Sequence, residues 1–344
     1  MGNRVFYVYT PPWVDWSAGT KVLHYFCDYL NKIGEDSYLA IHGPKLKNEE
    51  TQKELNTRVL DRKLLKQHKR EKKQVIAIYP EGVSGNPLGG NVIIRWLLNY
   101  ASLLGGDINF SSEDYIWAYS KNIADSYYSE TGIRVPVFFI PAVNVSEVDS
   151  VLDIPLIHGD YEILYAQKFR ALGGKPEVQS VNRIIEITRF NSNSTTRAET
   201  LNLLKFAQAV HVFENTSIAT EAALFGVPVI CHRNELFDTL IAEHELGLDG
   251  FSWFPHPGFI VDSANARDML QSAWSSVSEN LCSILGQIDT APKNLINGDK
   301  VRLPNRSVFS KHVFARARLL IRQKGLLVFG RFLLNYVRRI FNQV

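Results

Sequence analysis

A stretch of eighteen residues, FENTSIATEAALFGVPVI at positions 213–230, combines acidic, amide and hydroxyl side chains at a spacing that suits ligand binding. A strand-like run, AVHVFE, comes just before a helical pattern. Asn215, Thr216 and Ser217 stand where that helix should begin, and all three are good capping residues. The free N–H groups of a helix start, together with the helix dipole, favour a bound phosphate.

Two carboxylates flank these capping residues. Glu214 ends the strand-like run, so we expect it to point into the mouth of a cleft. Glu221 lies one turn inside the helix, where it can accept hydrogen bonds from a diol such as a ribose. The alternative is structural: a helix cap followed by a solvated helix glutamate.

The elements that must position this stretch are alternating strands and helices, which indicates βαβ units and doubly wound parallel sheets. The polar residues 45–73 are expected to be an exposed helical or mobile excursion, and 145–155 a linker. The predicted strands are RVFYVYT, DSYLAIHG, VIAIYPE, DYIWAYS, VPVFFIPAV, EILYAQKF, NRIIEITRF, AVHVFE and VPVICH. The predicted helices are AGTKVLHYFCDYLNKIG, NVIIRWLLNYASLLG, TRAETLNLLKFA, SIATEAALFG and SANARDMLQSAWSSVSENLCSILGQI.

The 344 residues are long for one hydrophobic core, so two domains are expected. We predict an α/β fold of two Rossmann-like domains with a cleft between them, followed by a basic amphipathic helical tail. The predicted boundaries are 1–148 for the N-terminal Rossmann-like domain, 149–305 for the C-terminal one, and 306–344 for the tail. Ligands of such sheets bind beyond the carboxyl ends of strands, where the strand order reverses.

The run TEAALFGVPVI resembles the donor-sugar signature of GT-B glycosyltransferases, whose retaining members carry Glu-x7-Glu, then Ala and a Gly-x-Pro-Val turn. Here six residues, not seven, separate Glu214 from Glu221. The resemblance implies that Glu214 contacts the donor sugar and that Glu221 contacts the nucleotide ribose. It also implies that the domain 149–305 binds a nucleoside-diphosphate sugar as the donor substrate, that the domain 1–148 binds the acceptor, and that no cofactor is needed.

The N-terminal half is similar to the first GT-B unit, where a glycine loop after the first strand opens a helix. Gly19 fits that loop and Gly34 fits the turn at the end of the helix. Segments such as YPEGVSGNPLGGNVIIRWLLN resemble bacterial surface-polysaccharide glycosyltransferases, and the whole resemblance covers about residues 1–260 in patches. It implies an acceptor that is a glycan or glycolipid.

Sugar transfer from a nucleoside diphosphate requires stabilisation of the leaving group, and GT-B enzymes resemble one another in using fixed cations rather than a metal. Lys168 and Arg189 follow strand ends and are candidates, with no metal ligand predicted. Arg170 fits a surface cation better. Arg197 is expected at most to pair with Glu199 or Glu214.

An inverting enzyme would also need a general base. Asp15 and Glu81 lie in loops after predicted strands of the N-terminal half and could serve, although Glu81 could equally cap the following glycine-rich turn. The stereochemical outcome stays open, with the near match to Glu-x7-Glu favouring retention.

Charge is distributed unevenly along the chain. Residues 300–344 contain eleven Lys and Arg and no Asp or Glu, whereas the other residues carry 27 basic and 35 acidic side chains, a net charge of −8. The tail from 308 onward reads as a basic amphipathic helix suited to an anionic membrane surface. The alternatives are packing back on the N-terminal domain or binding nucleic acid, and no nucleic-acid-binding motif accompanies the charge.

Bulk composition and cysteine usage limit the remaining classes. With 45% apolar and 21% charged residues the chain fits a globular protein, and no apolar run reaches the length of a membrane span. Cys27, Cys231 and Cys282 show no metal or redox spacing and are expected to be reduced core thiols. Together with the GT-B resemblance and the basic tail, these features lead us to expect a cytoplasmic glycosyltransferase at the inner face of the cell membrane that extends a lipid-linked glycan. The alternative is a sugar-nucleotide epimerase or a noncatalytic binding or scaffolding subunit of similar fold.

Overall fold

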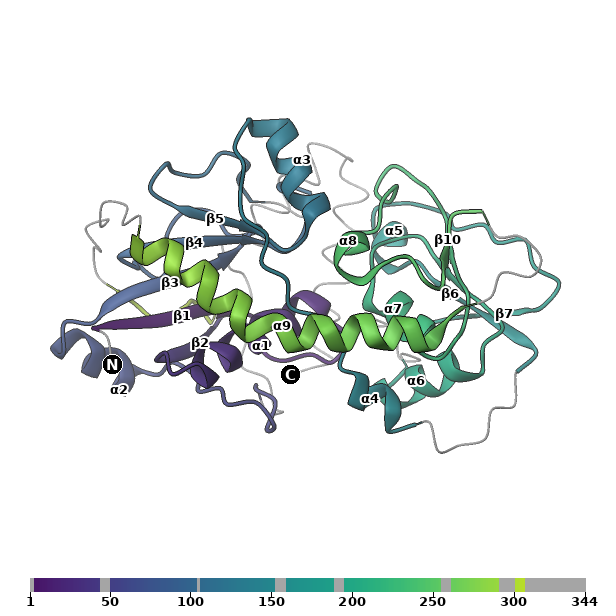
Figure 1. The fold of residues 1–344 in the computed structure, drawn as a ribbon, viewed down its shortest axis with the longest axis horizontal. Helices are drawn as coiled ribbons and strands as arrows, with labels where there is room; N and C mark the ends of the chain where they lie inside the picture. The colour runs from purple at the N-terminus through teal and green to yellow at the C-terminus, as the bar shows by residue number, and fades with distance from the viewer. Residues whose placement is uncertain are drawn as a thin grey trace. The chain divides into compact units, whose positions relative to one another are not determined.

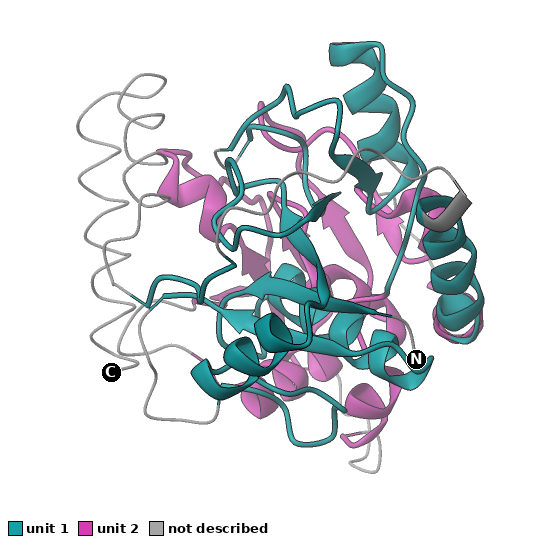
Figure 2. Cartoon of the chain, turned by 90° about the vertical axis from the view of Figure 1, so that its left-hand side faces the viewer, with its two compact units in different colours: residues 1–140, 275–322, 340–344 teal, residues 141–274, 323–339 magenta. Residues whose placement is uncertain are grey.

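The computed structural model describes residues 3–43, 50–103, 106–151, 159–188, 195–254, 261–290 and 301–306. The described chain divides into two compact units, shown in different colours in Figure 2. Unit 1 comprises the described residues up to Ile140 and those from Ser275 onward, and unit 2 comprises Pro141 to Trp274.

Unit 1 is built on a five-stranded parallel sheet with the strand order β2-β1-β3-β4-β5 (Figure 1). Most of the strand residues are buried, as expected for a parallel sheet covered on both faces. Its elements are β1 (Arg4–Thr10), α1 (Ala18–Lys32), β2 (Ser37–Ile41), α2 (Arg62–Arg70), β3 (Gln74–Pro80), β4 (Val92–Leu97), β5 (Tyr115–Ala118) and α3 (Lys121–Thr131).

Helix α1 shows how the sequence sets the bounds of an element. The Ser17 side chain accepts a hydrogen bond from the Thr20 N–H and caps the start of the helix. After the helix, Gly34 takes a φ of +89°, a conformation that glycine adopts at little cost. One face of α1 packs against β1 and β2, as the amphipathic pattern predicts.

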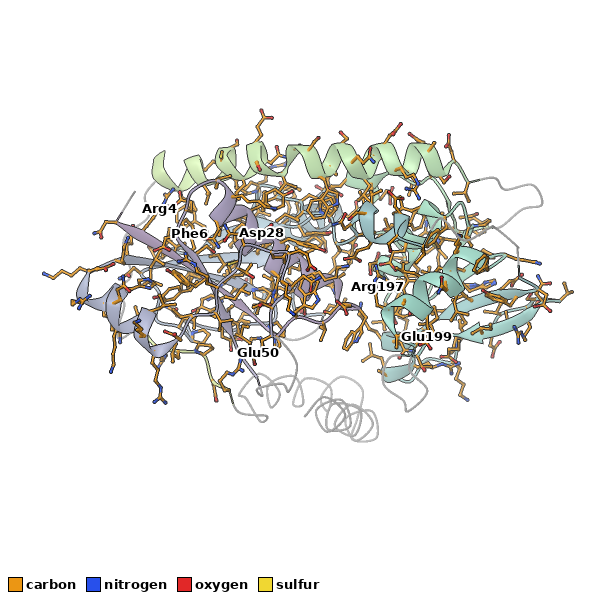
Figure 3. The ribbon with its side chains drawn as sticks, turned by 90° about the horizontal axis from the view of Figure 1, so that it is seen from below. Arg4, Phe6, Asp28, Glu50, Arg197 and Glu199 are labelled. Carbon is orange, nitrogen blue, oxygen red and sulfur yellow. The ribbon has the colours of Figure 1, made fainter. Side chains whose placement is uncertain are left out.

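The C-terminal part of the described chain belongs to the core of unit 1. Val301 and Leu303 pack against a cluster that includes Tyr79 and Leu88. The Arg302 N–H donates to the carbonyl oxygen of Leu88 at 2.9 Å. Arg306 forms an ion pair with Glu50, which is labelled in Figure 3. Unit 1 is therefore completed by residues that are distant in sequence from its sheet.

Unit 2 has a second five-stranded parallel sheet, with the order β10-β9-β8-β6-β7. If each sheet is numbered from its own first strand, both have the order 2-1-3-4-5. The elements that begin in unit 2 are α4 (Val145–Asp149), β6 (Tyr161–Tyr165), α5 (Gln167–Ala171), β7 (Arg183–Glu186), α6 (Arg197–Phe206), β8 (Val210–Val212), α7 (Ser217–Leu224), β9 (Val229–Cys231), α8 (Glu243–Leu246), β10 (Phe251–Ser252) and α9 (Ser263–Thr290). The predicted α/β class with two parallel-sheet domains is confirmed.

One predicted helix is wrong. The segment NVIIRWLLNYASLLG contains the buried strand β4, Val92–Leu97. The run Val92–Leu97 is apolar except for Arg95 and is rich in β-branched types, and a short run of this kind fits a buried strand as well as a helix. The parallel sheet of unit 1 resolves that ambiguity, because both faces of β4 are covered.

Other differences are local. The predicted strand VPVFFIPAV forms only an isolated bridge between Ala118 and Val137, since Pro136 and Pro141 lack the N–H groups of a ladder. The expected excursion at 45–73 contains α2, with 44–49 outside the described residues. The expected linker contains α4, whose buried side chains Val145 and Val148 pack in unit 2.

The observed unit boundaries differ from the predicted ones. The first falls between Ile140 and Pro141 rather than at 148/149, because α4 packs with Leu201 and Leu224. The described residues 275–290 and 301–306 belong to unit 1, not to the second domain. The predicted tail at 306–344 lies outside the described residues except for Arg306.

Two remaining expectations concern membranes and thiols. Within the described part of the chain, no helix is long and apolar enough to cross a membrane. Cys27 and Cys231 are buried, as expected for core thiols, whereas Cys282 is exposed on α9. The prediction that all three cysteines lie in the core is therefore wrong for Cys282.

Candidate functional site

The strand order of unit 2 places a topological switch point between β6 and β8. From β6 the chain goes to β7 on one side, and the sheet then continues on the other side with β8. The crevice outside the carboxyl ends of two such strands is the general ligand site of open α/β sheets. Two loops meet there: the one that follows β6 and begins α5, and the one that follows β8 and begins α7.

Glu214 joins these two loops. Its Oε2 accepts hydrogen bonds from the backbone N–H groups of Lys168 and of Phe169, the latter at 3.0 Å, in the first turn of α5. The residue is only 4% exposed, and its other oxygen, Oε1, is buried without a hydrogen-bond partner in the described structure. Glu214 is thus at the predicted place, but as a buried carboxylate rather than one projecting into a cleft mouth. Its contact with a donor sugar stays a prediction.

Lys168 supplies an exposed cation at this switch point. Its side chain is 48% exposed, and its Nζ donates a hydrogen bond to the carbonyl oxygen of Asn215 at 3.2 Å. The same Nζ lies 3.9 Å from Oε1 of Glu214. An ammonium group held here can be reached by an anionic ligand while the buried carboxylate behind it keeps it in place.

The Asn215 side chain has a structural role. Its amide nitrogen donates to the carbonyl oxygen of Thr239 at 3.0 Å, and its Oδ1 accepts from the Ile241 N–H at 2.9 Å. Because its amide nitrogen and its Oδ1 both bond to the loop at 239–241, the Asn215 side chain holds that loop in place and is not expected to contact a ligand.

The predicted helix start is confirmed. Thr216 is the N-cap of α7, and its hydroxyl oxygen accepts from the Ile218 N–H at 3.3 Å. Ser217 is the first helical residue and is half-buried. In the described part of the chain no group accepts a hydrogen bond from the Ser217 N–H, so this end of the helix dipole can bind an anion beside Lys168.

Glu221 is held in a buried ion-pair network. Its side chain is 1% exposed, and its Oε2 accepts from Arg197 at 2.7 Å. A second guanidinium nitrogen of Arg197, which lies at the start of α6 (Figure 3), donates to Glu147 at 2.8 Å. Burial alone would lower the pKa of Arg197, but Glu221 and Glu147 outweigh it and raise that pKa above its ordinary value.

This network corrects one expectation and changes the interpretation of another. Arg197 pairs with Glu221 and Glu147, not with Glu199 or Glu214 as predicted; Glu199 instead caps α6 through Thr196. The carboxylate expected to bind a ribose already has a charged partner. Ribose binding by Glu221 therefore stays a prediction that must compete with this ion pair.

The predicted residues of the N-terminal half lie near the switch point of unit 1, between β1 and β3. Asp15 is exposed, and its Oδ1 accepts from the indole N–H of Trp13 at 2.6 Å. Glu81 is 6% exposed, and its Oε2 accepts from the Leu98 N–H at 3.0 Å. Leu98 follows β4 and does not belong to the glycine-rich turn that Glu81 was expected to cap, so this bond bears out neither the catalytic nor the capping role. Gly19 was expected in a loop but lies in the first turn of α1.

The structure describes only one of the two arginines that were considered together with Lys168. Arg170 makes a two-point contact with Glu186, at 2.6 and 3.0 Å, and is the surface cation that the sequence favoured. Arg189 lies outside the described residues. Among the described residues, no group of three or more His, Cys, Asp and Glu side chains is arranged to hold a metal ion.

The sequence did not reveal one polar cluster in unit 2. Glu162 on β6, His211 on β8 and His232 just after β9 form a hydrogen-bonded chain. Glu162 and His211 each stand between apolar neighbours in their strands, and His232 directly follows its strand, so only the strand order could bring the three together.

Comparisons with known proteins find similar solved structures but no similar sequence. No protein-family model and no curated protein sequence matches the chain. Among solved structures, it is similar to an alpha-glucosyltransferase in complex with UDP and a DNA 13-mer containing an HMU base, at 11% identity and a TM-score of 0.41. That similarity covers 84% of this chain and 99% of the other.

Two further structures are similar at the same level. For the T4 phage beta-glucosyltransferase the identity is 10% and the TM-score 0.39, over 83% of this chain and 99% of the other. For UGT71G1 of Medicago truncatula, complexed with UDP-glucose, the identity is 9% and the TM-score 0.37, over 93% of this chain and 98% of the other. Likeness at this level does not establish a shared activity.

Proposed function

We propose that the protein is a glycosyltransferase of the GT-B type and that unit 2 binds a nucleoside-diphosphate sugar at its switch point. The exposed ammonium group of Lys168, held by Glu214 and Asn215 next to the start of α7, is the observation that carries this proposal. A cation and a helix N-terminus at the carboxyl ends of parallel strands together favour a diphosphate.

The chemistry follows from this arrangement. When the bond between the sugar and the diphosphate breaks, negative charge develops on the phosphate oxygen. A fixed ammonium group and a helix dipole stabilise that charge without reorganising, which lowers the barrier to transfer. We propose that transfer proceeds without a metal ion and that Lys168, with Arg189 as a further candidate, stabilises the leaving group.

The finer assignments are also part of the proposal. The acceptor is a glycan or glycolipid in bacterial surface-polysaccharide synthesis, and the protein works in the cytoplasm at the inner face of the membrane. The support is the sequence resemblance and the unbroken positive charge of the chain from residue 300 onward. Solved glucosyltransferases of similar outline were captured with DNA, so a DNA acceptor is included in the tests.

Calorimetry tests the donor site. UDP, GDP, CDP and dTDP are titrated into the whole protein, and at least one should bind. Because hydrogen bonds to charged groups contribute roughly 1.5–3 kcal/mol, Lys168→Ala should weaken the bound nucleotide about 10- to 100-fold. Lys175→Ala removes an exposed lysine from the same connection and serves as the control. Failure of all four nucleotides to bind would refute the proposal.

A noncatalytic sugar-nucleotide-binding protein is the second candidate. It is favoured by one specific observation: both signature carboxylates, Glu214 and Glu221, are already engaged within the protein. Release of the nucleoside diphosphate separates the two candidates. A transferase releases it when glycan, glycolipid or DNA acceptors are supplied, whereas a binding protein retains the intact sugar nucleotide with every acceptor.

A further inference from the structure

Three neighbouring strands of unit 2 contribute to one chain of hydrogen bonds. Oε2 of Glu162 lies 2.8 Å from Nε2 of His211, and Nδ1 of His211 lies 2.9 Å from Nε2 of His232. The strands β6, β8 and β9 are adjacent in the sheet, and the three side chains therefore lie across it in order. We call these three residues the Glu162–His211–His232 relay.

The inner end of the relay is buried and hydrogen-bonded. The side chains of Glu162 and His211 are 13% and 5% exposed. Oε1 of Glu162 accepts from the amide of Asn182 at 2.8 Å, and that amide also donates to Gln208. Burial alone would raise the pKa of Glu162, but hydrogen bonds from His211, Asn182 and Ser180 outweigh it and lower that pKa. Glu162 is therefore a carboxylate at neutral pH.

The outer end is fixed by stacking. The ring of His232 lies parallel to that of Phe213, with the centroids 4.3 Å apart and an interplanar angle of 3°. Phe213 in turn stacks on Phe169, in the first turn of α5. Burial, followed by repulsion from His211 whenever that ring is protonated, lowers the pKa of His232 to about 4, which keeps this half-buried ring neutral near pH 7.

These contacts determine which nitrogens carry hydrogen. A carboxylate can only accept, so Nε2 of His211 must be protonated, and a neutral His211 then has its lone pair on Nδ1. That lone pair faces Nε2 of His232, which must therefore carry the hydrogen of its own ring. The remaining nitrogen, Nδ1 of His232, is left with a lone pair. No described residue donates a hydrogen bond to it.

The position of this nitrogen relates it to the candidate site. Val212 pairs with Cys231 in the ladder, so Phe213 and His232 are the next residues of the same two strands. His232 thus follows β9 at the carboxyl edge where Glu214 follows β8. The relay ends one strand away from the switch point.

We propose that the Glu162–His211–His232 relay fixes the tautomer of His232 so that its Nδ1 accepts a hydrogen bond from a hydroxyl group of a bound sugar nucleotide. The inference rests on the proposed donor site of unit 2. A lone pair repels a phosphate oxygen and attracts a neutral donor, so His232 selects the hydroxyl-rich part of the ligand, and Lys168 its phosphates.

The relay also makes this preference reversible by acid. When Nδ1 of His232 takes a proton from the solvent, Nε2 of His232 can pass its hydrogen to Nδ1 of His211. The added positive charge then rests on His211 beside the Glu162 carboxylate. In that state Nδ1 of His232 is a donor, and the group that accepted a hydroxyl hydrogen now favours an anion.

Nitrogen-15 NMR of the whole protein, labelled at histidine, tests the tautomer without any ligand. At pH 7.5 the expected spectrum shows Nδ1 of His232 unprotonated and Nε2 protonated. On acidification His211 and His232 should change together, and Glu162→Gln should move that change to lower pH, because the imidazolium loses its carboxylate. A protonated Nδ1 at pH 7.5 in the wild-type protein would overturn the inference.

Binding of deoxy analogues tests the ligand. His232→Phe keeps a flat ring against Phe213 but removes both nitrogens, and His232→Gln is a second variant if the first fails to fold. His244→Phe, at an exposed position on α8, is the control. One deoxy analogue, which lacks the hydroxyl that His232 contacts, should bind the wild-type protein roughly three- to tenfold more weakly than the full sugar nucleotide does. The same analogue and the full sugar nucleotide should bind His232→Phe equally well.

The outcomes separate the two proposals. If sugar nucleotides bind but every deoxy analogue loses the same affinity in wild type and in both variants, the hydroxyl contact is wrong and the donor site stands. If no sugar nucleotide binds the wild-type protein at all, the proposed function fails, and the ligand part of the relay fails with it.

Discussion

Replacing Glu221 with alanine distinguishes a structural carboxylate from a ligand contact. The side chain is 1% exposed, and its partner Arg197 is 19% exposed. Removing one member of a buried ion pair typically costs about 3–5 kcal/mol, because the other charge is left without compensation. Arg197 keeps its contact with Glu147, which is 32% exposed. We therefore expect the lower end of that range, about 3 kcal/mol of the free energy of unfolding.

Urea unfolding measured through the signal of unit 2 gives the magnitude directly. With a denaturant slope of about 2–3 kcal/mol per M, a loss of about 3 kcal/mol lowers the midpoint by roughly 1–1.5 M. Glu186→Ala is the matched control, because it breaks an ion pair with Arg170 whose side chain is 45% exposed. Exposed pairs contribute about 0–1 kcal/mol, so the control should move the midpoint by less than about 0.5 M.

A double variant, Arg197→Met with Glu221→Met, tests the cause. Replacing a buried pair with apolar side chains of similar size is often neutral or stabilising, so the double variant should recover most of the loss. The reasoning is refuted if Glu221→Ala unfolds within about 0.5 M of wild type. If that variant also loses all affinity for nucleoside diphosphates, Glu221 is a ribose contact after all.

Four further outcomes are expected. Burial lowers the pKa of His24 to about 4 from its ordinary 6.5, so the stability that depends on its neutral form is complete above pH 6.5 and is lost as the pH falls toward 4. The loss amounts to about 3 kcal/mol of the free energy of unfolding. His24→Phe should therefore make that free energy depend less on pH between 6.5 and 4. Gly106→Ala should lower the melting temperature far more than Gly34→Ala, since both glycines have positive φ but only at Gly106 would a Cβ meet a backbone atom, the carbonyl oxygen of Glu81 at 2.1 Å. Transfer should be unaffected by EDTA, and restoration of a chelated enzyme by manganese would contradict the proposed role of Lys168. Deletion of residues 308–344 should abolish co-sedimentation with anionic liposomes at low salt while turnover of a short soluble acceptor continues; equal sedimentation of both forms would end the membrane proposal.

The sequence predicted the parts of the fold that depend on local pattern. Alternating apolar runs located most strands, and capping residues located helix starts such as that of α7 at Thr216. The strand β4 could not be distinguished from a helix, because a short run that is apolar except for Arg95 has the same appearance in both. Only pairing with β3 and β5 decides its conformation, and pairing is not visible in the segment itself.

In the candidate site, too, the sequence predicted what depends on local pattern and missed what depends on contacts between distant residues. The position of Glu214 and Glu221 at the end of a strand and inside the next helix follows from local pattern. Their partners do not: Glu221 meets Arg197 from another helix, and Glu214 meets the first turn of α5. The relay to His232 was invisible for the same reason, since it depends on the order of three strands.

The placement of Val301 and Leu303 in the core of unit 1 affects how the chain can fold during synthesis. Residues 141–274, the described part of unit 2, are continuous, so they can pack together before the later residues of unit 1 leave the ribosome. Unit 1 begins first but stays open along Tyr79 and Leu88 until residues 301–306 have emerged. At about 5–20 residues per second that delay is on the order of 10–30 s. During it the apolar side chains that Val301 and Leu303 later cover stay exposed in the nascent chain.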